Sequence, residues 1–218
     1  MPSTVPDVAV LFDMDGVLVD SGAHHRQAWR VLLDELGVTP SRPDFWRLTI
    51  GRPSVEAVPL LLDRATPLPE ARRLAERKQH HYRLLSREGS QPVRGVVAFV
   101  GDLVARGVPR AVATSASRVD AEPILERIGL RDRFDVLVTA EDVRRGKPDP
   151  EVYLRAARGL GQEPARCLVF EDALVGVRAA RSAGMRVIGV STAHTEIELC
   201  AAGAERAIGH FEGLTWPA

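Results

Sequence analysis

The sequence predicts an α/β fold, in which helices flank a mostly parallel sheet and an all-helical segment follows the first strand. From residue 92 onward, short β-branched apolar runs alternate with helical stretches, which is the pattern of a parallel sheet covered by helices. An apolar run at residues 8–12 predicts one more buried strand near the start of the chain. Residues 23–87, between these two regions, carry no strand pattern.

The first predicted strand is followed by two aspartates and a glycine, Asp13, Asp15 and Gly16. Carboxylates two residues apart in nearly extended chain project to the same side, and ligands of open α/β sheets bind at the carboxyl ends of the strands. Two such carboxylates repel, and a divalent cation or a shared proton would make them tolerable. Taken alone, the Asp-Gly pair is equally typical of an ordinary turn.

Residues 21–88 predict helices only. An apolar stripe at Ala28, Val31, Leu32 and Leu36 favours a first helix that Asp20 or Ser21 caps and that stops at Gly37. Further helices are predicted at 44–48, 54–63 and 69–86. We interpret this region as a helical cap, inserted between the two parts of an α/β catalytic core, residues 1–20 and 89–218. The crossings at 19–23 and 87–91 hold small and polar residues, which is typical of hinges.

The rest of the chain predicts the remaining sheet and its covering helices. Helices are expected at 96–106, 119–128, 150–158 and 174–183. Strands are expected at 109–114, 134–138, 167–170, 186–190 and 206–208. The strand before Ser115 runs into hydroxyls that precede a helix, and such a strand end can cradle a phosphate. A serine there is more commonly just a helix N-cap.

Length and charge limit the classes of function. A chain of 218 residues can hold one full core and an insertion. Its 29 basic and 29 acidic residues balance, so we expect no nucleic-acid partner and no membrane partner. The chain shows no membrane-length apolar run, and its first residues lack the basic and long apolar regions expected of a signal peptide. Cys167 and Cys200 lack zinc-type spacing. We therefore expect a cytoplasmic monomer with free thiols.

Several stretches together resemble motifs of the haloacid dehalogenase (HAD) superfamily, in its phosphatase and phosphomutase branch. The stretch DMDGVLVDS is similar to the first motif, the serine-bearing strand end to the second, GKPDP to the third, and FEDALVGVRAARSAGM to the fourth. The motifs occur in the family's order between residues 8 and 185. The resemblance implies a Rossmann-like core. It argues against dehalogenation, because members that cleave carbon–halogen bonds lack the second aspartate.

The resemblance also implies the roles of the core residues. Asp13 would be the nucleophile that takes the phosphoryl group, Asp15 the general acid and base, and Lys147 the cation that supports the nucleophile. Mg²⁺ would be bound by the Asp13 carboxylate, the Asp15 carbonyl and Asp172, with Glu171 as a ligand directly or through water. The transferring phosphate would be held by Ser115, with Thr114 as the alternative one residue away. Gly16 and the Ala116 N–H complete that set.

The cap resembles the β-phosphoglucomutase and sugar-phosphatase members of the branch. His25 and Lys78 match a hinge histidine and a cap lysine, and Gly51 with Arg52 would contact the substrate, although the match fails around Gly51. The mutase has a lysine just before this glycine and an arginine three residues after it, which hold a second phosphate. Here those places are Ile50 and Ser54, with Arg52 as a partial substitute, and this favours the phosphatase reading.

The expected function is Mg²⁺-dependent hydrolysis of a small phosphorylated metabolite, a sugar phosphate, through an aspartyl phosphate. A β-phosphoglucomutase-type phosphomutase is the first alternative, because only the second attacker differs: water in a phosphatase, a sugar hydroxyl in a mutase. A non-catalytic phosphate-binding protein is the alternative of another class. A dinucleotide-binding oxidoreductase is disfavoured, since it needs Gly-x-Gly-x-x-Gly where this chain has Asp-Met-Asp-Gly.

Overall fold

The computed structural model describes residues 8–40, 43–87, 89 and 91–217. Its centre is a six-stranded sheet of order β5-β4-β1-β6-β7-β8, in which every neighbouring pair is parallel. The strands are β1 (Ala9–Phe12), β4 (Arg110–Ala113), β5 (Val136–Val138), β6 (Cys167–Glu171), β7 (Arg186–Val190) and β8 (Arg206–Ile208). This arrangement confirms the predicted fold class. Because β1 lies between β4 and β6, its carboxyl end is at the middle of the sheet.

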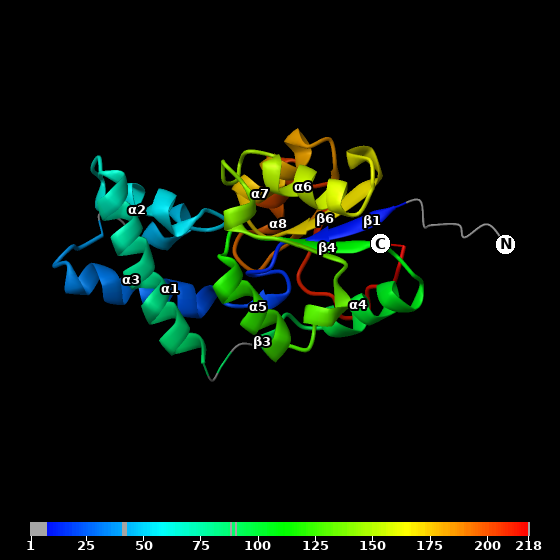
Figure 1. Cartoon of the computed structure of the whole chain (residues 1–218), viewed down its shortest axis with the longest axis horizontal. Coiled ribbons are helices and arrows are strands. Elements are labelled where there is room, and N and C mark those ends of the chain that lie inside the picture. The colour runs from blue at the N-terminus through cyan, green and yellow to red at the C-terminus, as the bar shows by residue number, and fades with distance from the viewer. Residues whose placement is uncertain (1–7, 41–42, 88, 90, 218) are drawn as a thin grey trace.

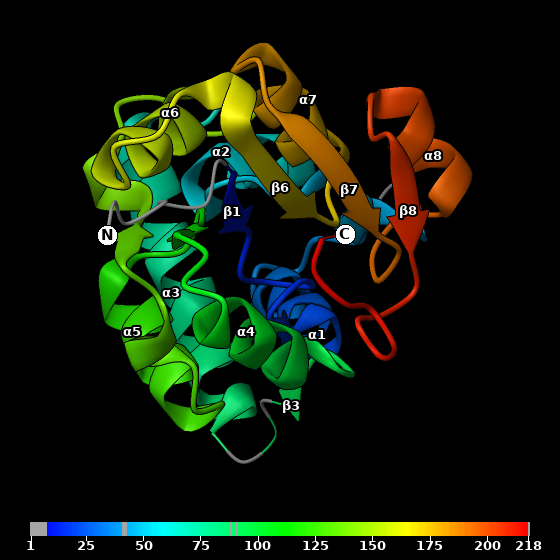
Figure 2. The same ribbon diagram turned by 90° about the vertical axis from the view of Figure 1, so that its right-hand side faces the viewer.

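Helices cover both faces of the sheet (Figure 2). On one face α4 (Val96–Ala105) and α5 (Arg118–Arg127) pack against side chains such as Val10 and Phe12. On the other, α6 (Glu151–Gly159), α7 (Leu174–Ser182) and α8 (Glu196–Ala202) pack against side chains such as Ala9 and Leu11. Successive residues of β1 therefore enter opposite layers, which is why the strand is apolar throughout.

Three helices form a separate group beside the sheet (Figure 1). They are α1 (Gly22–Glu35), α2 (Ser54–Leu62) and α3 (Leu68–Ser86), and a 3₁₀ turn at Phe45–Leu48 lies between α1 and α2. Each turns an apolar stripe inward to one shared cluster, which includes Trp29, Leu32, Phe45, Val58 and Leu74. We keep the name cap for residues 21–88. The boundary after residue 88 stays a prediction, and residues 1–7, 88 and 218 lie outside the described residues.

The two crossings between the helical group and the sheet pair with each other. The strands β2 (Val19–Asp20) and β3 (Gln91–Pro92) form a two-stranded antiparallel ladder. We did not predict these strands, because two residues are too few to show a period. The second predicted hinge includes residues 88 and 90, which lie outside the described residues.

The prediction missed one helix and misplaced the ends of several other elements. Helix α8 was missed because only Leu199 of its seven residues is buried, so it shows no apolar stripe. Ser21 stands at the N-cap of α1, but its hydroxyl does not cap the helix. Most other helices and strands begin or end one or two residues from the predicted bounds.

Two observations concern the cysteines and the hydropathy of the helices. Cys167 is buried in β6, Cys200 is exposed, and both are free thiols. Among the described residues, every helix is too short or too polar to cross a membrane.

Candidate active site

A cavity of about 690 Å³ lies between the cap and the carboxyl ends of the central strands. Most of the predicted site residues line it, although they come from distant parts of the chain. From the core these are Asp13, Asp15, Gly16, Thr114, Ser115, Ala116 and Asp172, and from the cap His25, Gly51, Arg52 and Lys78. Lys147 and Glu171 are fully buried beside Asp13 and Asp172, outside the cavity lining.

Lys147 joins the acidic residues of two strands. Its Nζ lies 2.9 Å from Asp13 Oδ1 and 2.7 Å from Glu171 Oε1. The Tyr153 hydroxyl also donates to Glu171 Oε1 at 3.0 Å, and the Ala173 N–H donates to Glu171 Oε2 at 2.6 Å. Oε1 of Glu171 therefore has two donors and Oε2 has one, and the side chain lies outside the cavity lining. Glu171 is better placed to hold Lys147 than to present a free oxygen to the cavity.

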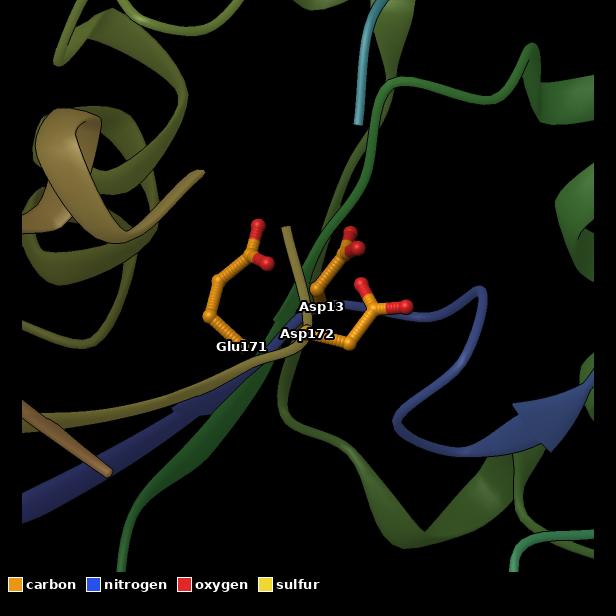
Figure 3. Close-up of side chains that lie close together, drawn as sticks. All are labelled: Asp13, Glu171 and Asp172. Carbon is orange, nitrogen blue, oxygen red and sulfur yellow. The ribbon is translucent and has the colours of Figure 1, made fainter. Parts of the chain in front are cut away.

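Asp13, Glu171 and Asp172 form a buried carboxylate cluster in which one ligand atom of each lies within 4.8 Å of the others (Figure 3). Burial raises the pKa of Asp13 to about 7, against the opposing charge of Lys147. Burial and the charge of Glu171 raise the pKa of Asp172 well above its ordinary value. One lysine thus faces three carboxylates, and the cluster lacks positive charge. This donor set of carboxylate oxygens fits Mg²⁺, which is a hard cation that binds oxygen ligands.

Two glycines allow the carboxylates to approach the backbone closely. Gly16 has a φ of +76°, and a Cβ there would lie 2.0 Å from Asp172 Oδ2. A Cβ on Gly176 would lie 1.6 Å from Glu171 Oε1. Any side chain at either position would displace an acidic residue, so both positions require glycine.

Asp15 is held on its Oδ1 atom. The Ser21 hydroxyl donates to Oδ1 at 2.6 Å, and His25 Nε2 lies 3.1 Å from the same atom. Burial alone would raise the pKa of Asp15, but His25, the Ser21 hydroxyl and Lys78 together lower it. Asp15 is therefore ionised at neutral pH before a substrate arrives. Neither hydrogen bond uses Oδ2, which remains available to a ligand.

The orientation of His25 is set by Lys78. Lys78 Nζ lies 2.7 Å from His25 Nδ1, and an ammonium group can only donate, so Nδ1 accepts and Nε2 carries the proton towards Asp15. Burial and the charge of Lys78 lower the pKa of His25, which keeps the ring neutral. Burial also lowers the pKa of Lys78 to about 8. The cap thus supplies a charged group, Lys78, that acts on Asp15 through a neutral histidine.

In this conformation, the groups predicted to bind phosphate form hydrogen bonds with other groups of the protein. Ser115 Oγ donates to the Gly51 carbonyl at 3.0 Å, and the Ala116 N–H donates to Thr114 Oγ1 at 3.0 Å. The loop at Gly51 packs closely on the core, because a Cβ there would lie 2.5 Å from the Ala173 Cβ. Both Thr114 and Ser115 line the cavity, so the choice between them stays open.

Sequence reasoning missed three residues that hold the acidic cluster in place. Thr192 donates to the Gly16 carbonyl at 2.7 Å and lies 3.3 Å from Asp172 Oδ2, and His194 Nδ1 lies 2.9 Å from the Asp172 carbonyl. The third is Tyr153, the partner of Glu171. A tyrosine in a helical apolar stripe and a threonine after a strand are both common. No sequence signal distinguished Tyr153, Thr192 or His194 from ordinary residues of a helix or a loop.

Comparison with known proteins identifies the family. The model of haloacid dehalogenase-like hydrolases matches residues 8–184. The chain belongs to this family. It is 35% identical over 209 residues to validoxylamine A 7'-phosphate phosphatase of Streptomyces hygroscopicus subsp. limoneus, with 95% of each chain covered. It is 36% identical over 188 residues to the phosphorylated carbohydrates phosphatase of Thermotoga maritima, with 84% of each covered.

The HAD-like fold is also evident among solved structures. The chain superposes on β-phosphoglucomutase of Clostridium difficile with a TM-score of 0.82 and 27% identity, covering 95% of this chain and 93% of that one. The predicted family and fold class are therefore confirmed, and the chain is an HAD-like hydrolase of the phosphatase type.

Proposed function

We propose that this enzyme hydrolyses a small phosphate monoester, a sugar phosphate, with Mg²⁺ and through a phosphoryl group carried on Asp13. The observation that supports this most is that two aspartates of different environment line one cavity. Asp13 is buried against Lys147, and Asp15 is ionised and held on one oxygen only. A carboxylate that a buried cation supports can act as a nucleophile, and a carboxylate with one free oxygen can take up and release a proton.

The proposed reaction has two steps. Lys147 lies against Asp13 Oδ1, so Asp13 Oδ2 attacks phosphorus while the bond to the leaving oxygen breaks. Asp15 gives that oxygen a proton, which it first takes up from solvent when the approaching phosphate dianion raises the pKa of Asp15. In the second step Asp15 removes a proton from water, and the water oxygen attacks the aspartyl phosphate. Phosphate leaves and Asp13 is restored.

Asp13 and Asp172, with the Asp15 carbonyl, are the groups that would hold Mg²⁺. When bound, the ion would neutralise phosphate oxygens and the acidic cluster, which otherwise repel each other. Lys147 reduces the same repulsion from the buried side. Glu171 keeps Lys147 in place through its 2.7 Å contact.

A sugar phosphate is the proposed substrate class for two reasons. The relatives that match include phosphatases named for phosphorylated carbohydrates and related compounds. A cavity of about 690 Å³ lies within the usual range for small-molecule sites, and its cap side offers Trp29, Trp46 and Arg52 to a polar ring. The phosphomutase is the second candidate, favoured by the similarity to β-phosphoglucomutase. Ile50 and Ser54 disfavour it, since neither carries a charge for a second phosphate.

A panel of sugar phosphates, assayed with Mg²⁺ and with or without glucose 1,6-bisphosphate, separates the candidates. Phosphate release that needs no primer is the expected result. Primer-dependent conversion of β-glucose 1-phosphate to glucose 6-phosphate would identify a mutase. Binding of sugar phosphates without any turnover would favour the phosphate-binding protein.

Magnesium is expected to raise the melting temperature more at pH 8 than at pH 5. Asp13 has a pKa of about 7 in the fold against 3.8 for an exposed carboxyl. A carboxyl group whose pKa is raised by folding stabilises the metal-free protein at pH values below its pKa in the unfolded chain. This contribution is lost as the pH rises through about 7. The deprotonated cluster that results is the form that binds metal. At about 100 times its Kd, Mg²⁺ would add about 2.7 kcal/mol of stability.

Thermal unfolding at both pH values, with EDTA or with Mg²⁺ at matched ionic strength, measures this. In Asp13→Asn the difference between the two pH values should shrink, because one of the two titrating carboxyl groups is gone and only Asp172 remains. A Mg²⁺ shift of equal size at both pH values in the wild type would contradict the assignment of Asp13 to the metal site.

A further inference from the structure

The cap and the core meet at one buried carboxylate that the proposed reaction does not use. Asp120, on α5 of the core, has a side chain that is 2% exposed. Its Oδ1 accepts from Arg83 Nε at 2.6 Å and its Oδ2 from Gln79 Nε2 at 3.0 Å, and both donors are on α3 of the cap. Ser117 Oγ, from the core, donates to Oδ2 at 2.5 Å.

A buried carboxylate is costly unless it is paired and hydrogen-bonded. Here the pairing comes from the cap, so it exists only while α3 lies on α5. An acidic residue in the first turn of a helix also favours the helix by itself, but that role needs no donor from elsewhere. Two donors from the cap therefore indicate a contact that favours the arrangement seen here, in which the cap lies on the core. We call this arrangement closed.

Gln79 connects this contact to the proposed acid and base. Its Nε2 donates to Asp120, and its Oε1 accepts from Lys78 Nζ at 3.1 Å. The two partners fix the amide orientation, because Asp120 can only accept and Lys78 can only donate. From Lys78 the hydrogen bonds continue to His25 and Asp15. An unbroken chain of contacts thus runs from Asp120 on the core, through the cap, and back to Asp15 on the core.

We propose that Asp120 is a positioning residue: when the cap closes, it orients Gln79 and Lys78, and through His25 it sets the geometry of Asp15. The inference rests on the proposed function of Asp15. It adds that Asp15 reaches the geometry for proton transfer only when the cap is closed. An open cap would leave Asp15 with Ser21 as a partner but without the aligned histidine. Proton transfer would then be slow until a substrate has been enclosed.

A second cap–core ion pair provides a matched control. Arg47 Nη2 lies 2.5 Å from Glu198 Oε1, with side chains 32% and 37% exposed. This pair also joins the cap to the core, but neither residue lines the cavity or contacts the chain from Asp120 to Asp15. Arg47→Gln removes a closing contact and leaves the chain of hydrogen bonds intact.

The first test observes His25 without requiring turnover. In protein labelled with ¹⁵N-histidine, NMR reports which ring nitrogen of His25 carries the proton, and His25→Gln assigns the signal. The wild type should show protonated Nε2 and unprotonated Nδ1. Asp120→Ala and Gln79→Leu should mix or shift these signals, whereas Arg47→Gln should not. His25 signals that stay unchanged in both variants would overturn the proposal.

The second test compares leaving groups in single-turnover experiments. Release of an alkoxide, as from glucose 6-phosphate, needs a proton, whereas release of p-nitrophenolate from p-nitrophenyl phosphate needs little help. Misplacing a catalytic group can cost roughly 100-fold, so Asp120→Ala and Gln79→Leu should slow the sugar ester about 10-fold to 100-fold and the aryl ester by a clearly smaller factor. Arg47→Gln should affect both esters alike.

Equal losses for both esters in Asp120→Ala and Gln79→Leu would reduce Asp120 to a structural contact and overturn its positioning role. A wild type that hydrolyses neither ester would instead reject the proposed function. In that case the His25 signals still decide whether Asp120 acts through Gln79. Gln79→Leu keeps the Asp120–Arg83 pair, so the test does not depend on the stability of Asp120→Ala.

Discussion

Asp13→Asn is expected to abolish turnover, with a loss of roughly 10⁴-fold or more, as is typical when a covalent nucleophile is removed. Asparagine fills nearly the same space between Lys147 and Asp172, so the fold should persist. It cannot form the acyl phosphate, because a neutral amide is a poor nucleophile. Since burial raises the pKa of Asp13 to about 7, the neutral amide should not lower stability at pH 8 in the absence of metal.

Phosphate release over a range of substrate concentrations measures this, with Asp34→Asn on the exposed face of α1 as a matched control. Asp15→Asn supplies the complementary experiment. With p-nitrophenyl phosphate it should accept a phosphoryl group but lose it slowly, because no base activates water. Mass spectrometry of digested protein should then find phosphate on Asp13. Turnover at the wild-type rate in Asp13→Asn would remove the covalent mechanism.

The sequence was sufficient for the sheet because the relevant signals are local. A run of four buried apolar residues followed by Asp13, Asp15 and Gly16 predicts strand, strand end and turn without knowledge of the rest of the chain. The same holds for the alternation after residue 92. The family resemblance then linked the strand ends. The carboxylate cluster of Asp13, Glu171 and Asp172 lies where that resemblance implied a metal site, although the metal itself remains a proposal.

The contacts that tune the site could not be predicted, because they join residues far apart in sequence through common side chains. Ser21 had the pattern of a helix cap, yet its hydroxyl donates to Asp15. Asp120 had the pattern of a charge in the first turn of a helix, yet its partners Gln79 and Arg83 lie about forty positions earlier. Competing roles of one side chain are decided by packing, and packing becomes visible only in three dimensions.

Lys147→Met is expected to destabilise the enzyme by about 3–5 kcal/mol when metal is absent, which is the usual cost of removing one partner from a buried ion pair. Lys147 is fully buried and lies within 3 Å of both Asp13 Oδ1 and Glu171 Oε1, so its loss leaves three carboxylates together without a cation. Turnover should also fall by at least about 100-fold, because Lys147 no longer reduces the repulsion between Asp13 and a phosphate dianion.

The double variant Lys147→Met/Glu171→Gln separates these two effects. A glutamine can keep the Ala173 hydrogen bond with its carbonyl oxygen and donate to the Tyr153 hydroxyl with its amide. Asp13 still loses Lys147, but the cluster then holds two carboxylates instead of three. Denaturant unfolding with EDTA should therefore show the double variant to be more stable than Lys147→Met. Its activity should stay as low as that of the single variant, since the positive charge is still missing. If Lys147→Met alone had the unfolding free energy and the turnover of the wild type, Lys147 would support neither the acidic cluster nor the nucleophile.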